Sequence, residues 1–260
     1  MLRKQYVTIY RVSAVLLCVL TTMLFYEKIV GFSDFIIVYA PMIAILFGFE
    51  FLLGRNFAFR INNILTDECD PEKFLTEYDS FYNINRSFDR INRYSAVINL
   101  GKYDEARQII ESAPPPETEK SKNYALLYYI NAANLNIFDG KFEEAQQKLD
   151  YVKNLELPPK DKSFSINAID GNEVELLRRQ GHLVESRRLL NELLQRKIPK
   201  ISVLSCVFAL GLISVEEQKY DEAKAAFRKV IDEGNKLYKV TLAKQELDKI
   251  QYLEDGRSTQ

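Results

Sequence analysis

Gly101-Lys-Tyr-Asp-Glu-Ala106 is the stretch that decides the fold, because it returns three times along the chain. The later copies read Gly140-Lys-Phe-Glu-Glu-Ala145, Gly181-His-Leu-Val-Glu-Ser186 and Gln218-Lys-Tyr-Asp-Glu-Ala223. An amphipathic run follows each copy: RQIIESA, QQKLDYV, RRLLNELL and KAAFRKVI. Self-similarity at about 37 to 41 residues is typical of stacked helical units.

Each copy predicts two antiparallel helices joined by a tight turn. The glycine lets the first helix end in a left-handed residue, and the aromatic residue or Leu two positions later can fill the space between the helices. Ala106, Ala145 and Ala223 are small where two helix axes should approach closely. One turn further on, each copy places a large apolar residue over the core: Ile110, Leu149, Leu190 and Phe227.

This pattern resembles the tetratricopeptide repeat, a two-helix unit whose second half often reads Gly-x-Tyr-x-Glu-Ala-x-x-x-Phe. The resemblance covers roughly residues 86–235 and is best in the fourth copy, where Leu210-Gly211 stands where the family's first helix carries Leu-Gly. The period exceeds the 34 residues of the family because the proline-containing connectors are longer. Copies one to three also lack that glycine and carry Tyr94, Ala133 and Val174 instead.

The fold class that follows is all-α, with an α-solenoid of tetratricopeptide-like helix pairs over residues 66–253. A stack of repeats exposes an apolar face at each end, so we expect one capping helix near 72–83 and another near 237–253. Asp70 or Thr66 could cap the first of these, and Pro71 suits a first helical turn. Residues 254–260 are expected to be a disordered tail.

Two uncharged apolar runs, 12–26 and 35–49, precede the repeats. Each run is shorter than the roughly 20 residues that cross a bilayer, but apolar flanks extend both, so residues 1–60 predict a transmembrane helical hairpin with helices at about 9–30 and 34–54. A cleaved signal peptide is disfavoured, because no small-x-small site follows the first run. Re-entrant or interfacial helices remain the alternative.

Basic residues lie before the first apolar run and after the second, and cytoplasmic flanks of membrane spans are enriched in such residues. This distribution predicts an integral membrane protein, in a bacterial plasma membrane, with both termini and the repeat domain in the cytoplasm. Arg11 and Glu50 intrude on the apolar segments at similar depth in such a hairpin. We expect them to form an intramembrane charge pair near the cytoplasmic interface. The alternative is that each side chain reaches separately to the headgroups.

In the tetratricopeptide family the first helices of the pairs commonly line a groove that receives a peptide or a partner helix. Carried over position by position, the resemblance implies a partner-binding groove with these residues: Ile98, Asn99, Leu127, Ile130, Asn134, Ile137, Glu175, Arg178, Phe208 and Leu212. Packing between helices is the alternative role for every one of them. Asn134 stands out, because a mid-helix amide among apolar neighbours must bond to the backbone or to a partner.

Composition argues against several other functions. A formal net charge of -1 gives no electrostatic reason to expect nucleic acid. The three cysteines are far apart and His182 is the sole histidine, so no metal site is predicted. Without a glycine-rich phosphate loop or a nucleophile elbow, we expect no catalytic residues, no cofactor and no enzymatic activity.

The predicted function is therefore a membrane-anchored cytoplasmic adaptor or scaffold that binds a protein or peptide partner, with the lipid bilayer as its second partner. The alternative is that the hairpin forms a homo-oligomeric membrane component, such as a translocation or channel subunit, with the repeat domain as its regulator.

Overall fold

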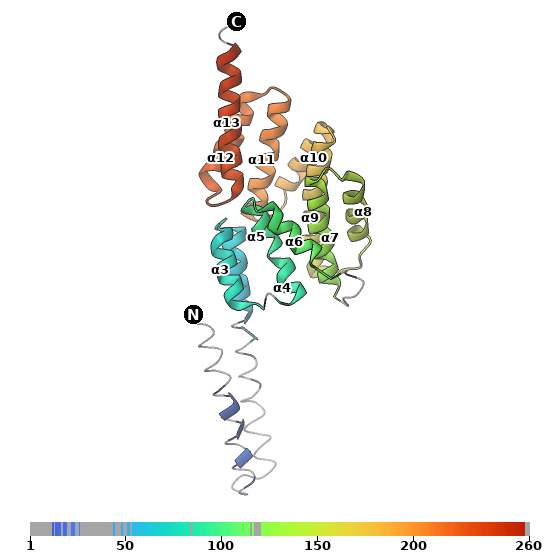
Figure 1. Cartoon of the computed structure of the whole chain (residues 1–260), viewed down its shortest axis with the longest axis vertical. Helices are drawn as coiled ribbons and strands as arrows, with labels where there is room; N and C mark the ends of the chain where they lie inside the picture. Colours follow the sequence, from blue (N-terminus) through green and yellow to red (C-terminus); the bar gives the residue numbers. More distant parts are fainter. Residues whose placement is uncertain are drawn as a thin grey trace. The chain divides into compact units, whose positions relative to one another are not determined.

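The computed structural model describes residues 54–83, 85–114, 116 and 121–257, and isolated positions between 12 and 52 (12, 14–16, 18–19, 22–23, 26, 44, 48 and 51–52). The chain divides into two compact units, residues 1–62 with 77–81 and residues 63–76 with 82–260. Regular structure in the described residues is helical throughout, as Figure 1 shows. After a helix at 54–66, the helices are α3 (Pro71–Phe81), α4 (Ser87–Asn92), α5 (Tyr94–Asn99), α6 (Tyr103–Glu111), α7 (Lys122–Phe138), α8 (Phe142–Lys153), α9 (Pro159–Arg179), α10 (Leu183–Leu194), α11 (Lys200–Glu216), α12 (Tyr220–Glu233) and α13 (Tyr238–Arg257).

The described part of the first unit is small. Phe57, on the helix at 54–66, stacks against Phe81 at the end of α3 with ring centroids 4.1 Å apart. Ile61 and Tyr78 are buried. An apolar contact of this kind stabilises two helical segments by removing both rings from water.

The second unit is an array of helix pairs, which confirms the predicted all-α solenoid architecture. The first helices are α4 with α5, then α7, α9 and α11, and the second helices are α6, α8, α10 and α12. Each first helix packs on its own second helix and on the first helix of the next pair, and α13 packs on both α11 and α12. Figure 1 shows α11, α12 and α13 side by side at the end of the array.

Every first helix ends in a residue with left-handed backbone, as the repeat motif predicts. The residues are Gly101 (φ 74°), Gly140 (φ 73°), Gly181 (φ 82°) and Gln218 (φ 60°). The N–H of the following residue then donates to a carbonyl five positions back: Lys102 to Val97 (3.2 Å), Lys141 to Asn136 (2.8 Å), His182 to Leu177 (2.9 Å) and Lys219 to Ser214 (2.8 Å). This bond satisfies a carbonyl that the helix end would otherwise leave open. The fourth copy forms the same turn without glycine and carries the strain of a side chain there.

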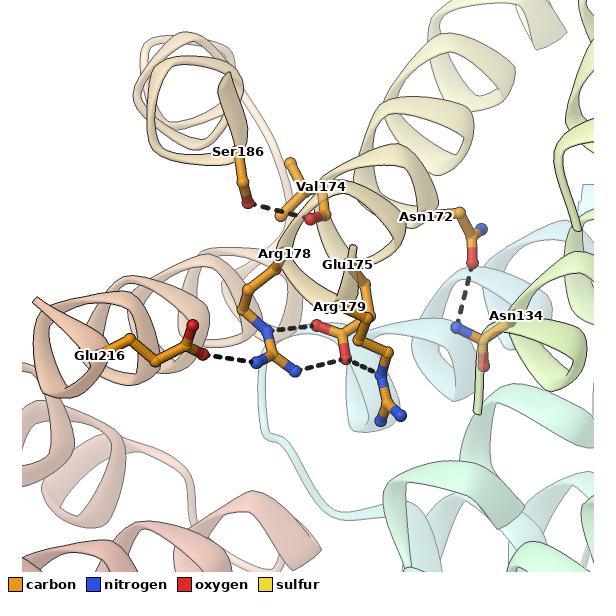
Figure 2. Close-up of polar contacts among 8 residues, drawn as sticks. All are labelled: Asn134, Asn172, Val174, Glu175, Arg178, Arg179, Ser186 and Glu216. Atoms are coloured by element: carbon orange, nitrogen blue, oxygen red, sulfur yellow. Dashed lines mark hydrogen bonds and ion pairs between the residues drawn. The ribbon is translucent and has the colours of Figure 1, made fainter. Parts of the chain in front are cut away.

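Close approach of the two helices in each pair explains the small residue of the motif. Ala106, Ala145, Ser186 and Ala223 are all 0% exposed. In the third copy the hydroxyl of Ser186 donates to the main-chain oxygen of Val174 on α9 at 2.9 Å, which Figure 2 shows. The serine therefore replaces alanine without leaving its hydroxyl unpaired in the core.

The missing first-helix glycines also have a packing reason. A Cβ on Gly211 would lie 2.6 Å from the Phe227 ring, so this glycine makes room for the phenylalanine. In the other copies a smaller aliphatic residue replaces that ring and shares a core cluster with a larger first-helix residue: Ile110 with Tyr94, Leu149 with Ala133 and Leu190 with Val174. The absence of the phenylalanine ring thus leaves room for a side chain on the first helix of these copies.

The predicted hairpin of residues 1–60 lies almost entirely outside the described residues, and Arg11 and Glu50 are among the residues not described. No helix in the described part of the chain is long and apolar enough to cross a membrane. The most apolar of them, α11, has 17 residues, fewer than the roughly 20 that a span requires, and it is packed within the array. The longer α9 and α13 carry charges along their length. This finding contradicts the predicted integral-membrane localisation, and that prediction is wrong.

The capping segments follow the sequence at one end and differ from it at the other. Asp70 accepts the N–H of Lys73 at 3.0 Å and so caps α3, which begins at Pro71. At the other end α13 continues to Arg257, past the point where the sequence placed the start of a disordered tail, and 258–260 lie outside the described residues.

Candidate protein-binding site

A ladder of polar side chains links three consecutive first helices. The Tyr94 hydroxyl donates to the Asn134 Oδ1 at 3.0 Å. The Asn134 Nδ2 donates to the Asn172 Oδ1 at 3.0 Å, as Figure 2 shows. The Asn172 Nδ2 donates in turn to the main-chain oxygen of Ala168 at 2.9 Å. The Asn134 amide is therefore bonded to its neighbours on both sides and fixes the register of α5, α7 and α9.

A charged cluster lies further along α9, where Figure 2 shows four side chains converging. The Glu175 carboxylate accepts from Arg178 Nε (3.0 Å) and Nη2 (2.8 Å) and from Arg179 Nε (2.6 Å). Arg178 Nη1 also donates to Glu216 on α11 at 3.2 Å. Burial opposes ionisation of Glu175, but the two guanidinium groups outweigh it and lower the pKa of this carboxyl. Glu175 is therefore a carboxylate at neutral pH.

Arg179 is held in place with part of its guanidinium unused. Its Cζ lies 5.1 Å from the centroid of the Phe138 ring, and its Nε is bonded to Glu175. The terminal nitrogens make no hydrogen bond to the described part of the chain, and the side chain is 30% exposed. A fixed planar guanidinium with free N–H groups is suited to bind an acceptor on another molecule.

Most of the apolar residues that the sequence assigned to a groove lie in the core. Ile130, Ile137 and Phe208 are buried in three separate clusters. Ile98, Leu127 and Leu212 are half-buried and pack against such clusters. Packing between helices therefore accounts for the burial of these six side chains, and their contact with a partner stays a prediction.

Asn99 has a partner that the sequence did not reveal, because the turn between α12 and α13 reaches back to the first repeat. Lys239 Nζ donates to the Asn99 Oδ1 at 3.3 Å. The Tyr238 ring covers Gly101, where a Cβ would lie 2.6 Å from the ring, and meets the Tyr103 ring edge-on at 6.2 Å between centroids. The last helix of the array thus contacts the end of the first one.

The same turn also bonds to the segment before α3. Asn235 Nδ2 donates to the main-chain oxygen of Glu68 at 2.8 Å, and the Lys236 main-chain N–H donates to the main-chain oxygen of Cys69 at 3.2 Å. The Lys236 ammonium lies 3.0 Å from Asp70 and 3.4 Å from Glu72. We call residues 234–239 the clasp turn, and residues 68–72 with 99–103 the acceptor surface.

Apolar packing completes this contact. Leu237 is 2% exposed and shares a cluster with Cys69 and with Leu204 of α11. The clasp turn is thereby anchored on both the acceptor surface and the fourth repeat. The sequence offered only Gly234-Asn235 as a turn signal here, which says nothing about where the turn packs.

The end of the clasp turn is electrostatically unusual. Lys239 as a whole residue is half-buried, but its ammonium is surrounded by protein. This burial lowers the pKa of the ammonium, and the negative charge of Glu175, which would raise that pKa, does not compensate. Burial raises the pKa of the nearby Cys206 thiol to about 11, so this cysteine is a thiol at neutral pH. Among the residues that the structure describes, no group of three or more His, Cys, Asp or Glu side chains could hold a metal ion.

Comparison with protein families identifies one segment of the array. A family model described as tetratricopeptide repeat matches residues 204–233, which cover most of α11 and all of α12. The chain therefore contains a tetratricopeptide repeat, as the resemblance of the fourth copy predicts. Comparisons with curated proteins and with solved structures give no significant match. A tetratricopeptide repeat supports a general role as a protein-interaction adaptor or scaffold.

Proposed function

We propose that the chain is an adaptor or scaffold that binds a protein or peptide partner across the first helices of its repeats. The observation that carries the proposal is the tetratricopeptide repeat at 204–233, stacked in line with three further pairs built on the same turn. First helices that contact one another from pair to pair offer a continuous surface to a partner.

Arg179 is the residue that we propose as the anchor on this surface. Its side chain is already fixed by Glu175 and Phe138, so binding through its terminal nitrogens would cost little side-chain entropy. Arginine is also enriched among the residues whose truncation most weakens protein interfaces. The partner would supply a hydrogen-bond acceptor, such as a carboxylate or a main-chain carbonyl.

The partner can be found by placing a photo-crosslinking amino acid in the full chain at Glu216, which is on α11 and has a side chain 42% exposed. The control position is Val184, which is on the second helix α10 and 83% exposed. We expect a defined protein to crosslink from position 216 and not from position 184. Equal crosslinking from both positions would argue for a different face of the array.

The affinity of the purified partner then tests the anchor. Arg179→Ala should weaken binding by about tenfold or more, because it removes an interface arginine. Arg188→Ala is the matched control, since Arg188 is an exposed arginine on α10 that is also paired with a carboxylate, Glu192. If the two variants bind the partner equally well, the proposed anchor is wrong.

A further inference from the structure

The clasp turn departs from the usual physics of repeat arrays. In a solenoid each repeat contacts only its neighbours, so contacts stay local in sequence. Here Lys239 bonds to Asn99 and Asn235 bonds to Glu68, at separations of 140 and 167 positions along the chain. The array is thus closed on itself by one short turn.

The polar contacts across the closure all run in one direction. The clasp turn donates through the Asn235 side chain, the Lys236 main chain and the ammonium groups of Lys236 and Lys239. The acceptor surface supplies main-chain oxygens, the Asn99 amide oxygen and two carboxylates. A surface that offers acceptors and negative charge to a basic segment is complementary to it in charge as well as in hydrogen bonding.

Apolar contacts accompany these polar ones. Leu237 is buried in one cluster with Cys69 and Leu204, and the Tyr238 ring lies on Gly101, the residue that leaves space for it. Main-chain hydrogen bonds combined with specific side-chain contacts are a common way in which a short segment is recognised. The acceptor surface therefore has the features of a peptide-binding site that is already filled.

The closure also carries internal costs. Cys69 on the acceptor surface and Asn235 in the clasp turn both have left-handed backbone (φ 55° and 48°), a conformation that L-residues adopt at some expense. Lys239 holds a partly desolvated ammonium against an amide oxygen. Strain of this kind lowers the free energy needed to open the contact.

We propose that the acceptor surface is a recognition site for a lysine- and tyrosine-bearing segment of the protein partner, and that the clasp turn occupies this site until such a segment displaces it. The inference rests on the proposed function, because it specifies which side chains the partner would present and proposes that the clasp turn regulates access to the same array. The site adjoins the proposed anchor, since the Tyr103 ring meets both Tyr238 and the Phe138 ring that supports Arg179.

A labelled peptide with the sequence of residues 233–241, EGNKLYKVT, is the probe, and its binding to the full chain is measured by fluorescence polarisation. Lys236→Ala weakens the clasp turn and leaves the acceptor surface intact, so a larger fraction of chains is open and the apparent affinity for the peptide rises. We expect a gain of about threefold or more, the scale of one partly exposed ion pair. Lys244→Ala, an exposed lysine further along α13, is the control and should behave as the wild type. A peptide with Leu237 and Tyr238 replaced by alanine should not bind.

Hydrogen exchange of the wild-type chain supplies a second measurement that needs no variant. Peptide binding should speed the exchange of amides 235–240, because the Lys236 N–H loses its bond to Cys69.

The outcomes separate this inference from the proposed function. If the peptide binds neither the wild type nor Lys236→Ala, while the partner still binds through Arg179, then the closure is only structural. This inference then fails and the proposed function stands. If Lys236→Ala forms dimers that exclude the peptide, the occupant is a second copy of the chain, which also overturns it. Loss of the Arg179 effect alone would overturn the proposed function and leave the peptide result standing.

Discussion

Replacing Gly101 by alanine tests the closure and the turn geometry in one substitution. Gly101 has φ 74°, and left-handed backbone costs an L-residue roughly 1–2 kcal/mol, of which about 0.4–1 kcal/mol is recovered because alanine is less flexible in the unfolded chain. The new Cβ would also lie 2.6 to 2.8 Å from the Cγ and both Cδ atoms of Tyr238. Those atoms are close to the backbone of Tyr238, so the ring cannot swing clear without moving α13.

Overpacking of this kind typically costs about 1–3 kcal/mol, so the total loss of unfolding free energy should be about 2–4 kcal/mol. Gly140→Ala is the control, because Gly140 has nearly the same backbone (φ 73°) and nothing lies within 4 Å of its Cβ position. That variant should lose only about 1 kcal/mol, the backbone part of the effect.

The assay is urea unfolding followed by far-UV circular dichroism, with the slope m compared between variants to confirm that the same surface unfolds. In a Tyr238→Ala background, Gly101→Ala should cost only about 1 kcal/mol relative to Tyr238→Ala alone, the backbone part of the effect, because the clash partner is gone. If Gly101→Ala and Gly140→Ala destabilise the chain equally, within about 0.5 kcal/mol, Tyr238 does not pack on Gly101 and the closure described above is wrong.

Three further outcomes follow from the same structure. Gln218→Gly should stabilise the chain by about 0.5–1 kcal/mol in urea unfolding, since it relieves a side chain at φ 60°; a loss of stability would contradict this. Ser186→Ala should cost less than about 1 kcal/mol, because it removes one hydrogen bond and restores the alanine of the other copies; a loss well above that value would show that the bond matters more than the packing. Asp139, which follows α7, accepts two hydrogen bonds from the Arg107 guanidinium on α6. The Arg107 contact lowers the pKa of Asp139, and burial of Glu175 is outweighed by the Arg178 and Arg179 contacts, which lower its pKa. The contribution of both carboxylates to stability is therefore complete above the ordinary carboxyl pKa and is lost as pH falls through the folded value. The urea midpoint should therefore drop below about pH 4, and a midpoint unchanged from pH 7 to pH 3 would count against these two contacts.

The repeated turn could be read from the sequence because its determinants are local. Gly101, Gly140 and Gly181 end their helices as the motif predicts, and the small residues that follow are fully buried. Each of these features depends on residues within one helix pair, so four copies reinforce a single interpretation. Even Gln218, which breaks the pattern, takes the conformation that its place in the repeat requires.

The candidate site was harder to predict, because a side chain on a first helix faces either its neighbours or a partner. Asn134 was expected to bond to the backbone or to a partner, and the structure shows that Tyr94 and Asn172 from adjacent first helices use its hydrogen-bonding groups. Arg178 was also placed in the groove; the structure shows its guanidinium between Glu175 and Glu216, and its contact with a partner stays a prediction. Which neighbour lies opposite depends on how consecutive pairs are rotated, and that rotation is not encoded in any one repeat.

The predicted integral-membrane localisation rested on hydropathy alone, and it was wrong. Hydropathy of the chain's beginning indicated two membrane spans, yet no described helix meets the length and apolarity of a span. The apolar residues of α11, such as Leu204 and Ile213, are buried against neighbouring helices.

By itself the sequence determined that this chain stacks helix pairs, where each first helix ends and which residues face the interior of each pair, because helical periodicity and turn geometry are set within a few residues. Only the tertiary structure decided that the array closes. Small rotations accumulate over four pairs until the clasp turn meets Asn99 and Cys69, and contacts so far apart in sequence arise from the sum of those rotations, not from any local pattern.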